Sequence, residues 1–347
     1  MDKLVNGLAY LCSLRDRDAL DGALVSVIFD YCGAHAGAVR LVQLLPTGPT
    51  VHALMRAERL AGAPGCERRV VWAEAADLPV LPPESLIARC AATGFPAVDE
   101  GRPYRVVFPV GNAPTPSTLL EIETSEAPAD HVIGVVQGVL QLYTNFEGLL
   151  DYGERDALTD LLNRKTFDGA FFKAAQAQAA LAQAPAMVDD RRRDNPDDGY
   201  WLAVLDIDHF KRVNDNFGHL IGDEVLLLMA RLMRSHFRYQ DQLYRFGGEE
   251  FVVLMRCGSH EDAASALVRF RAAVEAYTFP QVGTITVSVG FAGLTDDDTP
   301  GGAFDRADKA VYYAKEHGRN QVCSYQKLVD SGELVEADTS ENDIDFF

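Results

Sequence analysis

The sequence lacks any apolar run that could span a membrane. A membrane-spanning helix needs about 20 consecutive apolar residues, and the apolar start of the chain is interrupted by Asn6 and ends in charged residues. This start also lacks the small-residue site at which signal peptides are cleaved. We therefore expect neither a membrane span nor a signal peptide, and a cytoplasmic location by default.

Closely spaced cysteines are also absent. The six cysteines are scattered and include no CxxC pair, which argues against a disulfide scaffold or a zinc ribbon. We expect buried free thiols in a reducing compartment. They are Cys12, Cys32, Cys66, Cys90, Cys257 and Cys323.

Basic residues are scarce. The chain has 32 Lys and Arg against 51 Asp and Glu, a formal net charge of -19. Such a chain is repelled by phosphate backbones and anionic lipids, so a generic nucleic-acid or membrane binder is excluded. A small anionic substrate remains possible, because a bound metal ion can reverse the local field.

The length of 347 residues predicts two domains. Residues 1–131 alternate predicted helices (18–33, 82–92) with predicted strands (38–45, 51–60, 105–110, 118–123), as a mixed α/β module does. They contain no phosphate loop, metal cluster or nucleophile motif. The order of elements resembles a GAF-type sensor domain; a PAS-type module or a degenerate dimerisation domain are the alternatives. No motif indicates the ligand or signal.

Residues 132–156 form a predicted signalling helix. Its apolar residues are spaced 3-4-3-4-3, the pattern of a heptad seam. The seam favours a parallel two-stranded coiled coil, and the alternative is one helix packing on its own domain. The seam residues are Val132, Val135, Val139, Leu142, Phe146 and Leu149.

The segment that follows begins as a helix rich in Ala and Gln and breaks at Pro185. Residues 185–199 are strongly charged and include Arg191, Arg192 and Arg193. An exposed loop is the simpler interpretation, and a phosphate-binding arginine cluster is the alternative.

Residues 157–326 alternate strands and helices in the order β-α-β-β-α-β, extended by one further helix and strand. This order predicts a ferredoxin-like α/β (α+β) domain. Residues 327–347 carry seven acids against Lys327 alone, and we expect this acidic tail to be disordered.

Acidic residues follow two neighbouring predicted strands. The string GGEEF places Glu249 and Glu250 on a hairpin turn, and Asp206 and Asp208 share one face at the end of an earlier strand. If the two strands lie side by side, Asp206 and Glu250 converge into an oxygen-only site suited to Mg²⁺. One acidic residue alone could simply be a solvent-exposed turn residue. Acidic residues on two neighbouring strands favour a metal site.

The same region resembles the diguanylate cyclases, or GGDEF domains. The resemblance covers about residues 156–325 and rests on seven strings in order, which do not agree by chance. GGEEF is an accepted variant, because Glu for Asp keeps the carboxylate. The strings are DALTDLLNR (156–164), DIDHFKRVND (206–215), FGHLIGDEVL (217–226), RYQD (238–241), GGEEF (247–251), SVGFA (288–292) and AKEHGRN (314–320).

The resemblance implies the conversion of two GTP into cyclic di-GMP and two pyrophosphates. Two Mg²⁺ (or Mn²⁺) ions per active site would neutralise the triphosphate. Asp206, the carbonyl of Ile207 and Glu250 would hold metal. Glu249 would lie nearest the attacking hydroxyl, as a base or a further metal ligand, and the division of roles between the two glutamates stays open.

The resemblance also implies the substrate-binding residues. Asn214 and Asp223 would bind the guanine edge, and Asp223 favours GTP over ATP. Lys315 and Arg319, expected on one helical face, would bind the β- and γ-phosphates. The alternative is that these two cations only compensate the dipole at an exposed helix C-terminus. Lys211, Phe210, Gly247 and Gly248 complete the implied substrate site.

RYQD stands at the offset from GGEEF that the family uses for product inhibition. Arg238 and Asp241 would contact cyclic di-GMP, with a second basic residue, Arg269 or Arg271, from the following helix. Because each domain binds one GTP, the reaction implies a homodimer. The non-enzymatic alternative is a silent receptor for GTP or cyclic di-GMP. Such receptors usually lose an acid or glycine of the signature, and all are present here.

Overall fold

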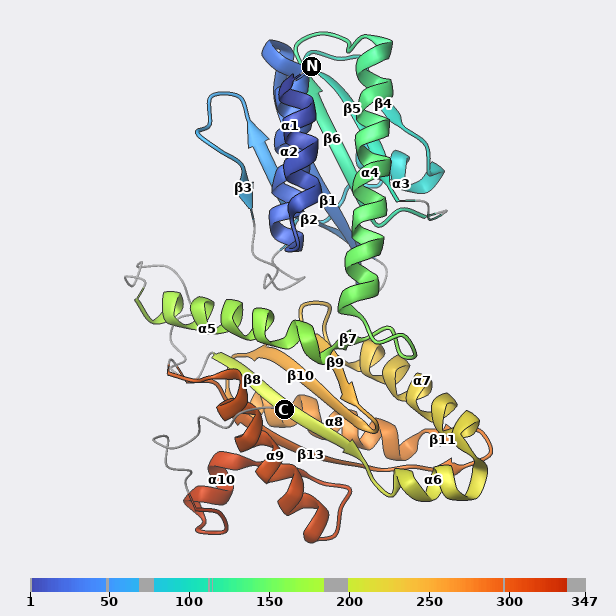
Figure 1. The fold of residues 1–347 in the computed structure, drawn as a ribbon, viewed down its shortest axis with the longest axis vertical. Helices are drawn as coiled ribbons and strands as arrows, with labels where there is room; N and C mark the ends of the chain where they lie inside the picture. The colour runs from blue at the N-terminus through green and yellow to red at the C-terminus, as the bar shows by residue number, and fades with distance from the viewer. Residues whose placement is uncertain are drawn as a thin grey trace. The chain divides into compact units, whose positions relative to one another are not determined.

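The computed structural model describes residues 2–47, 50–68, 78–111, 113, 115–183, 199–295 and 297–335. The chain divides into two compact units, Met1–Gly153 and Glu154–Phe347, and each unit has its own sheet and hydrophobic core (Figure 1).

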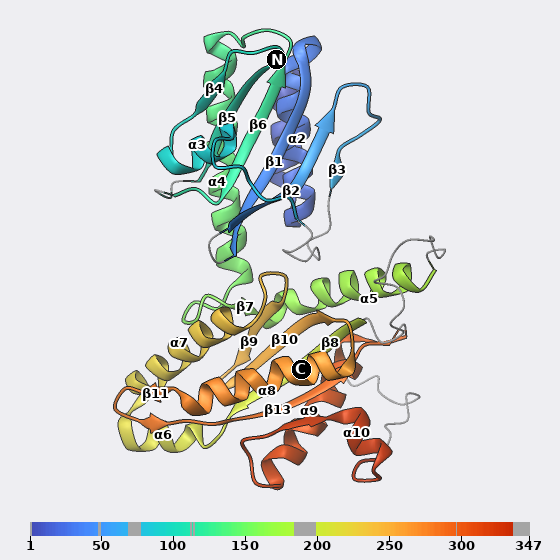
Figure 2. The same cartoon turned by 180° about the vertical axis from the view of Figure 1, so that it is seen from behind.

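The first unit is an antiparallel sheet of six strands with helices on both faces (Figure 2). The helices α1 and α2 and the long helix α4 pack on one face, and α3 packs on the other. The strands lie in the order β3 (Glu67–Arg68), β2 (Thr50–Leu60), β1 (Ala36–Thr47), β6 (Thr118–Thr124), β5 (Tyr104–Val110) and β4 (Ala97–Asp99). The helices are α1 (Asp2–Ser13), α2 (Arg17–Cys32), α3 (Leu86–Thr93) and α4 (Asp130–Glu154), with a short 3-10 turn at Gly33–His35.

Capping residues explain where the predicted helices of this unit begin. The Asp16 carboxylate accepts from the amide of Ala19 at the start of α2, and the Ser85 hydroxyl accepts from the amide of Ala88 at the start of α3. Each satisfies a backbone donor that has no partner within the helix. α3 ends at Gly94, whose φ of 68° is left-handed.

α4 contains the predicted heptad seam. Val132, Val135, Leu142 and Phe146 are partly buried against the core of the same unit, and Leu149 is 66% exposed. The fully buried face of α4 is formed by Val136, Val139, Leu140, Tyr143 and Leu150. Within one chain, the alternative in which the helix packs on its own domain thus accounts for most of the apolar pattern.

A buried polar group fixes α4 against the rest of the unit. Asp21, 1% exposed on α2, accepts from the Tyr143 hydroxyl at 2.5 Å and pairs with Arg56 of β2 at 2.6 Å. The Tyr143 oxygen also lies 3.0 Å from Glu147. A phenol has one hydrogen, so the Tyr143 hydroxyl donates to only one of these two carboxylates at a time. Burial raises the pKa of both Asp21 and Glu147.

The second unit has a six-stranded sheet, and β8, α7, β9, β10, α8 and β13 follow the predicted ferredoxin-like order. The strands lie in the order β14 (Val322–Ser324), β13 (Val287–Gly293), β8 (Gly199–Ile207), β10 (Glu250–Cys257), β9 (Gln242–Gly247) and β7 (Leu162–Asn163). The helices are α5 (Phe167–Gln183), α6 (Phe210–Phe217), α7 (His219–His236), α8 (His260–Ala276), α9 (Pro300–Glu316) and α10 (Tyr325–Asp330), with a 3-10 turn at Arg164–Thr166 and a small hairpin of β11 (Thr278–Phe279) and β12 (Gly283–Thr284).

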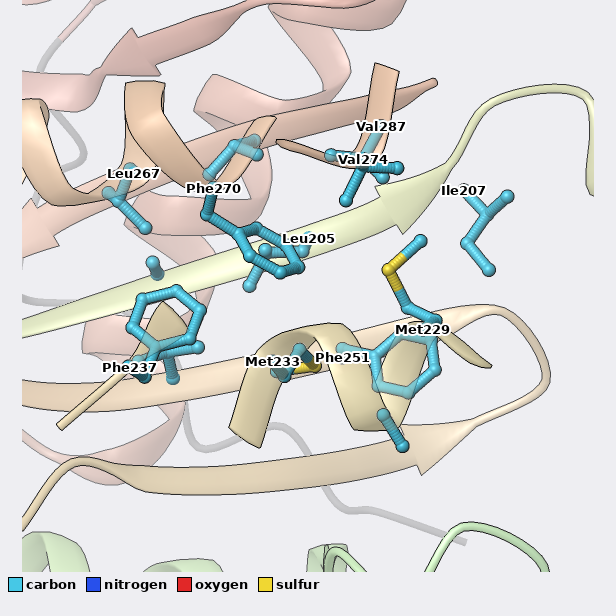
Figure 3. Packing of buried hydrophobic residues seen from close by; sticks show 14 of the residues in the cluster. Leu205, Ile207, Met229, Met233, Phe237, Phe251, Leu267, Phe270, Val274 and Val287 are labelled. Atoms are coloured by element: carbon cyan, nitrogen blue, oxygen red, sulfur yellow. The ribbon is translucent and has the colours of Figure 1, made fainter. Parts of the chain in front are cut away.

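The main core of this unit lies between the sheet and the helices α7 and α8. Figure 3 shows Leu205 of β8 with Met233 of α7 and Phe270 of α8 in this cluster. α9 covers the other face of β13 and β8 and forms a smaller cluster with β14 and α10. Both faces of β8 are therefore covered, which explains its continuous apolar sequence.

Several expectations need correction or fall outside the described residues. A helix expected from about residue 223 to 237 is present as α7, which begins earlier, at His219, and the preceding helix α6 was not predicted from the sequence. The expected disordered tail begins as a helix, α10, and Leu328 packs against the α9 cluster. Residues 336–347 and the arginines at 191–193 lie outside the described residues. All six cysteines are free, but only Cys90 and Cys323 are buried. None of the described helices is long and apolar enough to cross a membrane.

Candidate active site

The carboxyl end of β8 brings acidic side chains to the face of the sheet that α9 covers. Leu205 and Ile207 point into the core (Figure 3), so the intervening Asp206 points to the opposite face. Glu250, the first residue of β10, is the direct cross-strand partner of Asp206. Opposite residues of a strand pair share a face. The structure thus brings Asp206 and Glu250 together, as the sequence predicted.

The turn before Glu250 has open space beside its two glycines, and its backbone is held by hydrogen bonds from Arg245. A β-carbon on Gly247 or Gly248 would meet no described atom within 4 Å, and the φ of Gly248 is +50°. Arg245 donates to the Gly248 carbonyl at 2.9 and 3.2 Å. The same guanidinium binds both carboxylate oxygens of Asp156, at 3.0 and 3.2 Å. The turn therefore offers room for a ligand while its backbone is held in place.

Four carboxylates gather at this site. Partial burial is the largest cause that raises the pKa of Asp206, Glu249, Glu250 and Asp308 above its ordinary value. The charge of Asp206 raises the pKa of both glutamates further, and Asp308 of α9 raises that of Glu250. The Lys315 ammonium opposes these effects. The site therefore has more negative than positive charge.

Lys315 lies in the site itself. Its Nζ is 2.7 Å from Oδ2 of Asp206, so it does not merely compensate the dipole of α9. The expectation that Lys315 and Arg319 share one helical face is wrong, because α9 ends at Glu316 and Arg319 has a left-handed φ of 63°. Arg319 is exposed in the turn that follows.

The donor set fits a hard divalent cation by its chemistry. Asp206 and Glu250 provide oxygen ligands, which Mg²⁺ prefers, and the excess negative charge favours a cation. Among the described residues, however, no three His, Cys, Asp or Glu side chains lie close enough together to hold a metal ion. The structure thus pairs two carboxylates of the expected site directly, Asp206 and Glu250.

The residues expected to bind guanine lie on neighbouring helices. A β-carbon on Gly222 would be 2.0 Å from Oδ1 of Asn214, so the glycine admits this amide beside α7. Asp223 follows and is exposed. Phe210 is only 4% exposed and packs in the core, so it supports the site rather than lining it. Lys211 is exposed on α6.

The RYQD string forms a tight turn. The Arg238 amide donates to Oδ2 of Asp241 at 2.8 Å, and the Asp241 amide donates to the Arg238 carbonyl at 3.0 Å. Arg269 is exposed on α8. Arg271 instead donates to Oδ1 of Asn320 at 2.7 Å. Of the two candidate basic residues, Arg269 is thus exposed and Arg271 is engaged with Asn320.

Sequence reasoning missed Asp308 and the role of Arg245. Asp308 precedes Lys315 by seven residues, two helical turns, and this spacing on one face of a predicted helix could have indicated it. Arg245 stands two residues before Gly247 on the same strand, but no sequence pattern indicates that it binds Asp156.

Comparison with known proteins identifies the second unit. Residues 154–321 match the family described as diguanylate cyclase, GGDEF domain. Diguanylate cyclase DgcP of Pseudomonas aeruginosa is 38% identical over 200 residues, 57% of this chain and 28% of DgcP. The chain thus spans less than a third of the length of that relative.

Two solved structures are similar over about half of the chain. The GGDEF domain of DgcB from Caulobacter crescentus, in complex with c-di-GMP, is 32% identical, with a TM-score of 0.43, over 50% of this chain and 96% of that one. The active GGEEF domain of a diguanylate cyclase from Vibrio cholerae is also 32% identical, with a TM-score of 0.40, over 48% and 97%.

Proposed function

We propose, from the match of residues 154–321 to the diguanylate cyclase GGDEF domain family, that the chain converts two GTP into cyclic di-GMP and two pyrophosphates. The observation that carries the proposal is the convergence of Asp206 and Glu250 beneath the open Gly247–Gly248 turn, with Lys315 beside them. The complete signature favours an enzyme over a silent receptor.

Asp206, the Ile207 carbonyl and Glu250 would hold two divalent cations, Mg²⁺ or Mn²⁺. These ions would neutralise the triphosphate and stabilise the charge that develops on the attacking and leaving oxygens. The 3′-hydroxyl oxygen of one GTP bonds to the α-phosphorus of the other, and the bond from that phosphorus to pyrophosphate breaks. Glu249, whose pKa burial raises, would receive the hydroxyl proton or serve as a further ligand.

The substrate would be bound at both of its ends. Lys315, which contacts Asp206, would bind the phosphates, and the exposed Arg319 and Lys211 would be further phosphate ligands. Asn214 and the exposed Asp223 would bind the guanine edge. A carboxylate accepts from the ring N–H and the amino group of guanine, and adenine offers no such pair, so this site favours GTP.

Regulation would involve the first unit and a second copy of the chain. Two substrate-loaded domains must face each other to close the cyclic product, so we expect a homodimer joined through the 132–156 helix. Residues 1–131 would act as a GAF-like sensor, with a PAS-like or purely dimerising module as alternatives. Arg238, Asp241 and Arg269 would bind the product and inhibit synthesis.

Nucleotide turnover with product identification tests this function. The purified chain with GTP and Mg²⁺ should yield cyclic di-GMP and two pyrophosphates for each product, less so when cyclic di-GMP is added. Glu250→Ala should abolish synthesis at an unchanged melting temperature, while Glu261→Ala, a control on α8 whose side chain is 74% exposed, should retain it. Full activity in Glu250→Ala would refute the site assignment, and GTP binding without turnover in the wild type would indicate the receptor.

A further inference from the structure

The turn after α9 has an unfavourable backbone. Gly318, Arg319 and Asn320 have φ values of 110°, 63° and 45°, three consecutive residues with positive φ. For residues other than glycine, the left-handed region costs roughly 1–2 kcal/mol each, less for Asn. Such a conformation persists only where the surroundings hold it.

The contacts of Asn320 provide this support. Its backbone N–H donates to Oδ2 of Asp208 at 3.1 Å. Its side-chain oxygen accepts from Arg271 at 2.7 Å, and its amide nitrogen donates to Glu275 at 2.8 Å. Arg271 and Glu275 form an ion pair one turn apart on α8, also at 2.7 Å. Asn320 is thus held from two sides of the fold, by the end of β8 and by α8.

Asp208 is itself rigidly held. It is 6% exposed, and its carboxylate accepts from Thr286 at 2.6 Å and from Ser288 at 2.7 Å. With the amide of Asn320, three donors surround the two oxygens. Buried carboxylates satisfied in this way are anchors for the groups that they bind. Although Asp208 is only two residues from Asp206, its contacts mark it as an anchor and not as a further metal ligand.

We propose that Asp208 and Arg271 are positioning residues for Arg319, which they direct toward the nucleotide phosphates by holding Asn320 in the left-handed turn. This inference rests on the proposed function, because the phosphate contact of Arg319 belongs to it. Neither residue touches substrate. Arg271 acts from α8 and Asp208 from β8, and both act through Asn320.

Steady-state kinetics and binding of Mg²⁺-pyrophosphate to the full-length chain test the proposal. Arg271→Ala removes a charge-assisted hydrogen bond, and such bonds account for about tenfold in binding. We expect about a tenfold rise in the KM for GTP and in the Kd for pyrophosphate, with kcat changed less than about twofold. Arg271→Lys keeps one donor to Asn320 and should restore part of the affinity. Asp208→Asn replaces a carboxylate oxygen that accepts from the Asn320 N–H with an amide group. It should raise the KM and the Kd as Arg271→Ala does.

A double-mutant cycle separates positioning from general destabilisation. If Arg271 acts through Arg319, Arg271→Ala should weaken pyrophosphate binding no further in an Arg319→Ala background. Arg231→Ala, an exposed arginine on α7, is the matched control and should change neither constant.

Additive effects in the cycle, or a lowered melting temperature with unchanged KM and Kd for Arg271→Ala, would overturn the proposal. The Arg271 variants decide it even if Asp208→Asn does not fold. A wild type that makes no cyclic di-GMP but binds pyrophosphate in the expected pattern would refute the proposed function alone. A wild type that does not bind pyrophosphate would refute the positioning role.

Discussion

At the scale of single residues, Gly290 fixes how closely α9 approaches the sheet. A β-carbon at this position of β13 would lie 2.2 Å from the carbonyl oxygen of Ala307 and 2.3 Å from the amide nitrogen of Val311. Both atoms belong to the backbone of α9, which carries Asp308 and Lys315. Only glycine therefore permits this close approach of α9, the helix that places Lys315 beside Asp206.

We predict that Gly290→Ala destabilises the second unit. Overpacking costs about 1–3 kcal/mol, and a clash with backbone atoms belongs at the upper end of that range. Chemical denaturation should show this loss, and GTP turnover should fall with it as α9 is displaced. Gly301→Ala, in the exposed first turn of α9 where the new β-carbon meets no described atom within 4 Å, should be neutral or slightly stabilising. Equal stability of the two variants would contradict this account.

Sequence motifs predicted the chemical roles of individual residues better than they predicted which residues contact each other. The strings placed Asp206 and Glu250 correctly, because strand alternation and pairing determine which faces they share. They predicted a helical backbone for Arg319, which is wrong because α9 ends three residues before it. The role of Arg245 was not predictable, because its partner Asp156 is 89 residues away in the sequence.

At the scale of elements, Arg245 joins the signature turn to the segment that follows α4. Asp156, two residues after the end of α4, accepts with both oxygens from one guanidinium nitrogen of Arg245 and also accepts from the amide of Thr159. Arg245 in turn binds the Gly248 carbonyl. A displacement of the segment at Asp156 thus has a direct route to the backbone of the active-site turn.

We predict that Arg245→Ala lowers kcat about tenfold, the effect expected when charge-assisted hydrogen bonds are lost. Arg245→Lys should be intermediate, because a lysine cannot bind Asp156 and Gly248 with one planar group. Single-turnover rates at saturating GTP measure the effect. A change confined to the melting temperature, with kcat intact, would show that Arg245 supports the fold and not the turn.

The buried polar group on α4 predicts a pH dependence of the first unit. The pKa of Glu147 is raised in the folded state, so its contribution to stability is complete below the unfolded pKa and is lost as the pH rises through the folded value. Glu147→Gln keeps a donor to Tyr143 without a charge. Amide exchange of α2 and α4 should then slow at neutral pH, with a flatter pH profile than wild type. Glu126→Gln, an exposed control, should keep the wild-type profile.

The apolar pattern of α4 illustrates why helix contacts are harder to predict than helices. The 3-4 spacing correctly predicted a helix, which spans Asp130–Glu154. A stripe of that kind can face a second chain or the helix's own domain. Which of the two it faces depends on the elements that pack against the helix. Within one chain, these elements bury Val139 and leave Leu149 exposed. The coiled-coil interpretation remains a prediction for the dimer.

At the scale of the whole molecule, each of the two units has its own core and sheet. We predict that the fragment Glu154–Phe347 folds alone and melts at the temperature of the corresponding transition in the full chain. Because the proposed reaction needs two substrate-loaded domains, its synthesis of cyclic di-GMP per mole should rise with fragment concentration. Scanning calorimetry and a dilution series measure both. A fragment that unfolds early, or whose specific activity is independent of concentration, would contradict the prediction.

The pairing of β8 with β10 also restricts which changes in chain length the second unit can tolerate. Core residues such as Leu205 alternate with active-site residues such as Asp206, and the partner strand alternates in the same register. Inserting or deleting one residue within either strand would exchange the two faces, with carboxylates in the core and leucine in the active site. Length variation among descendants of this sequence should therefore be absent within 199–207 and 250–257 and accumulate outside these strands.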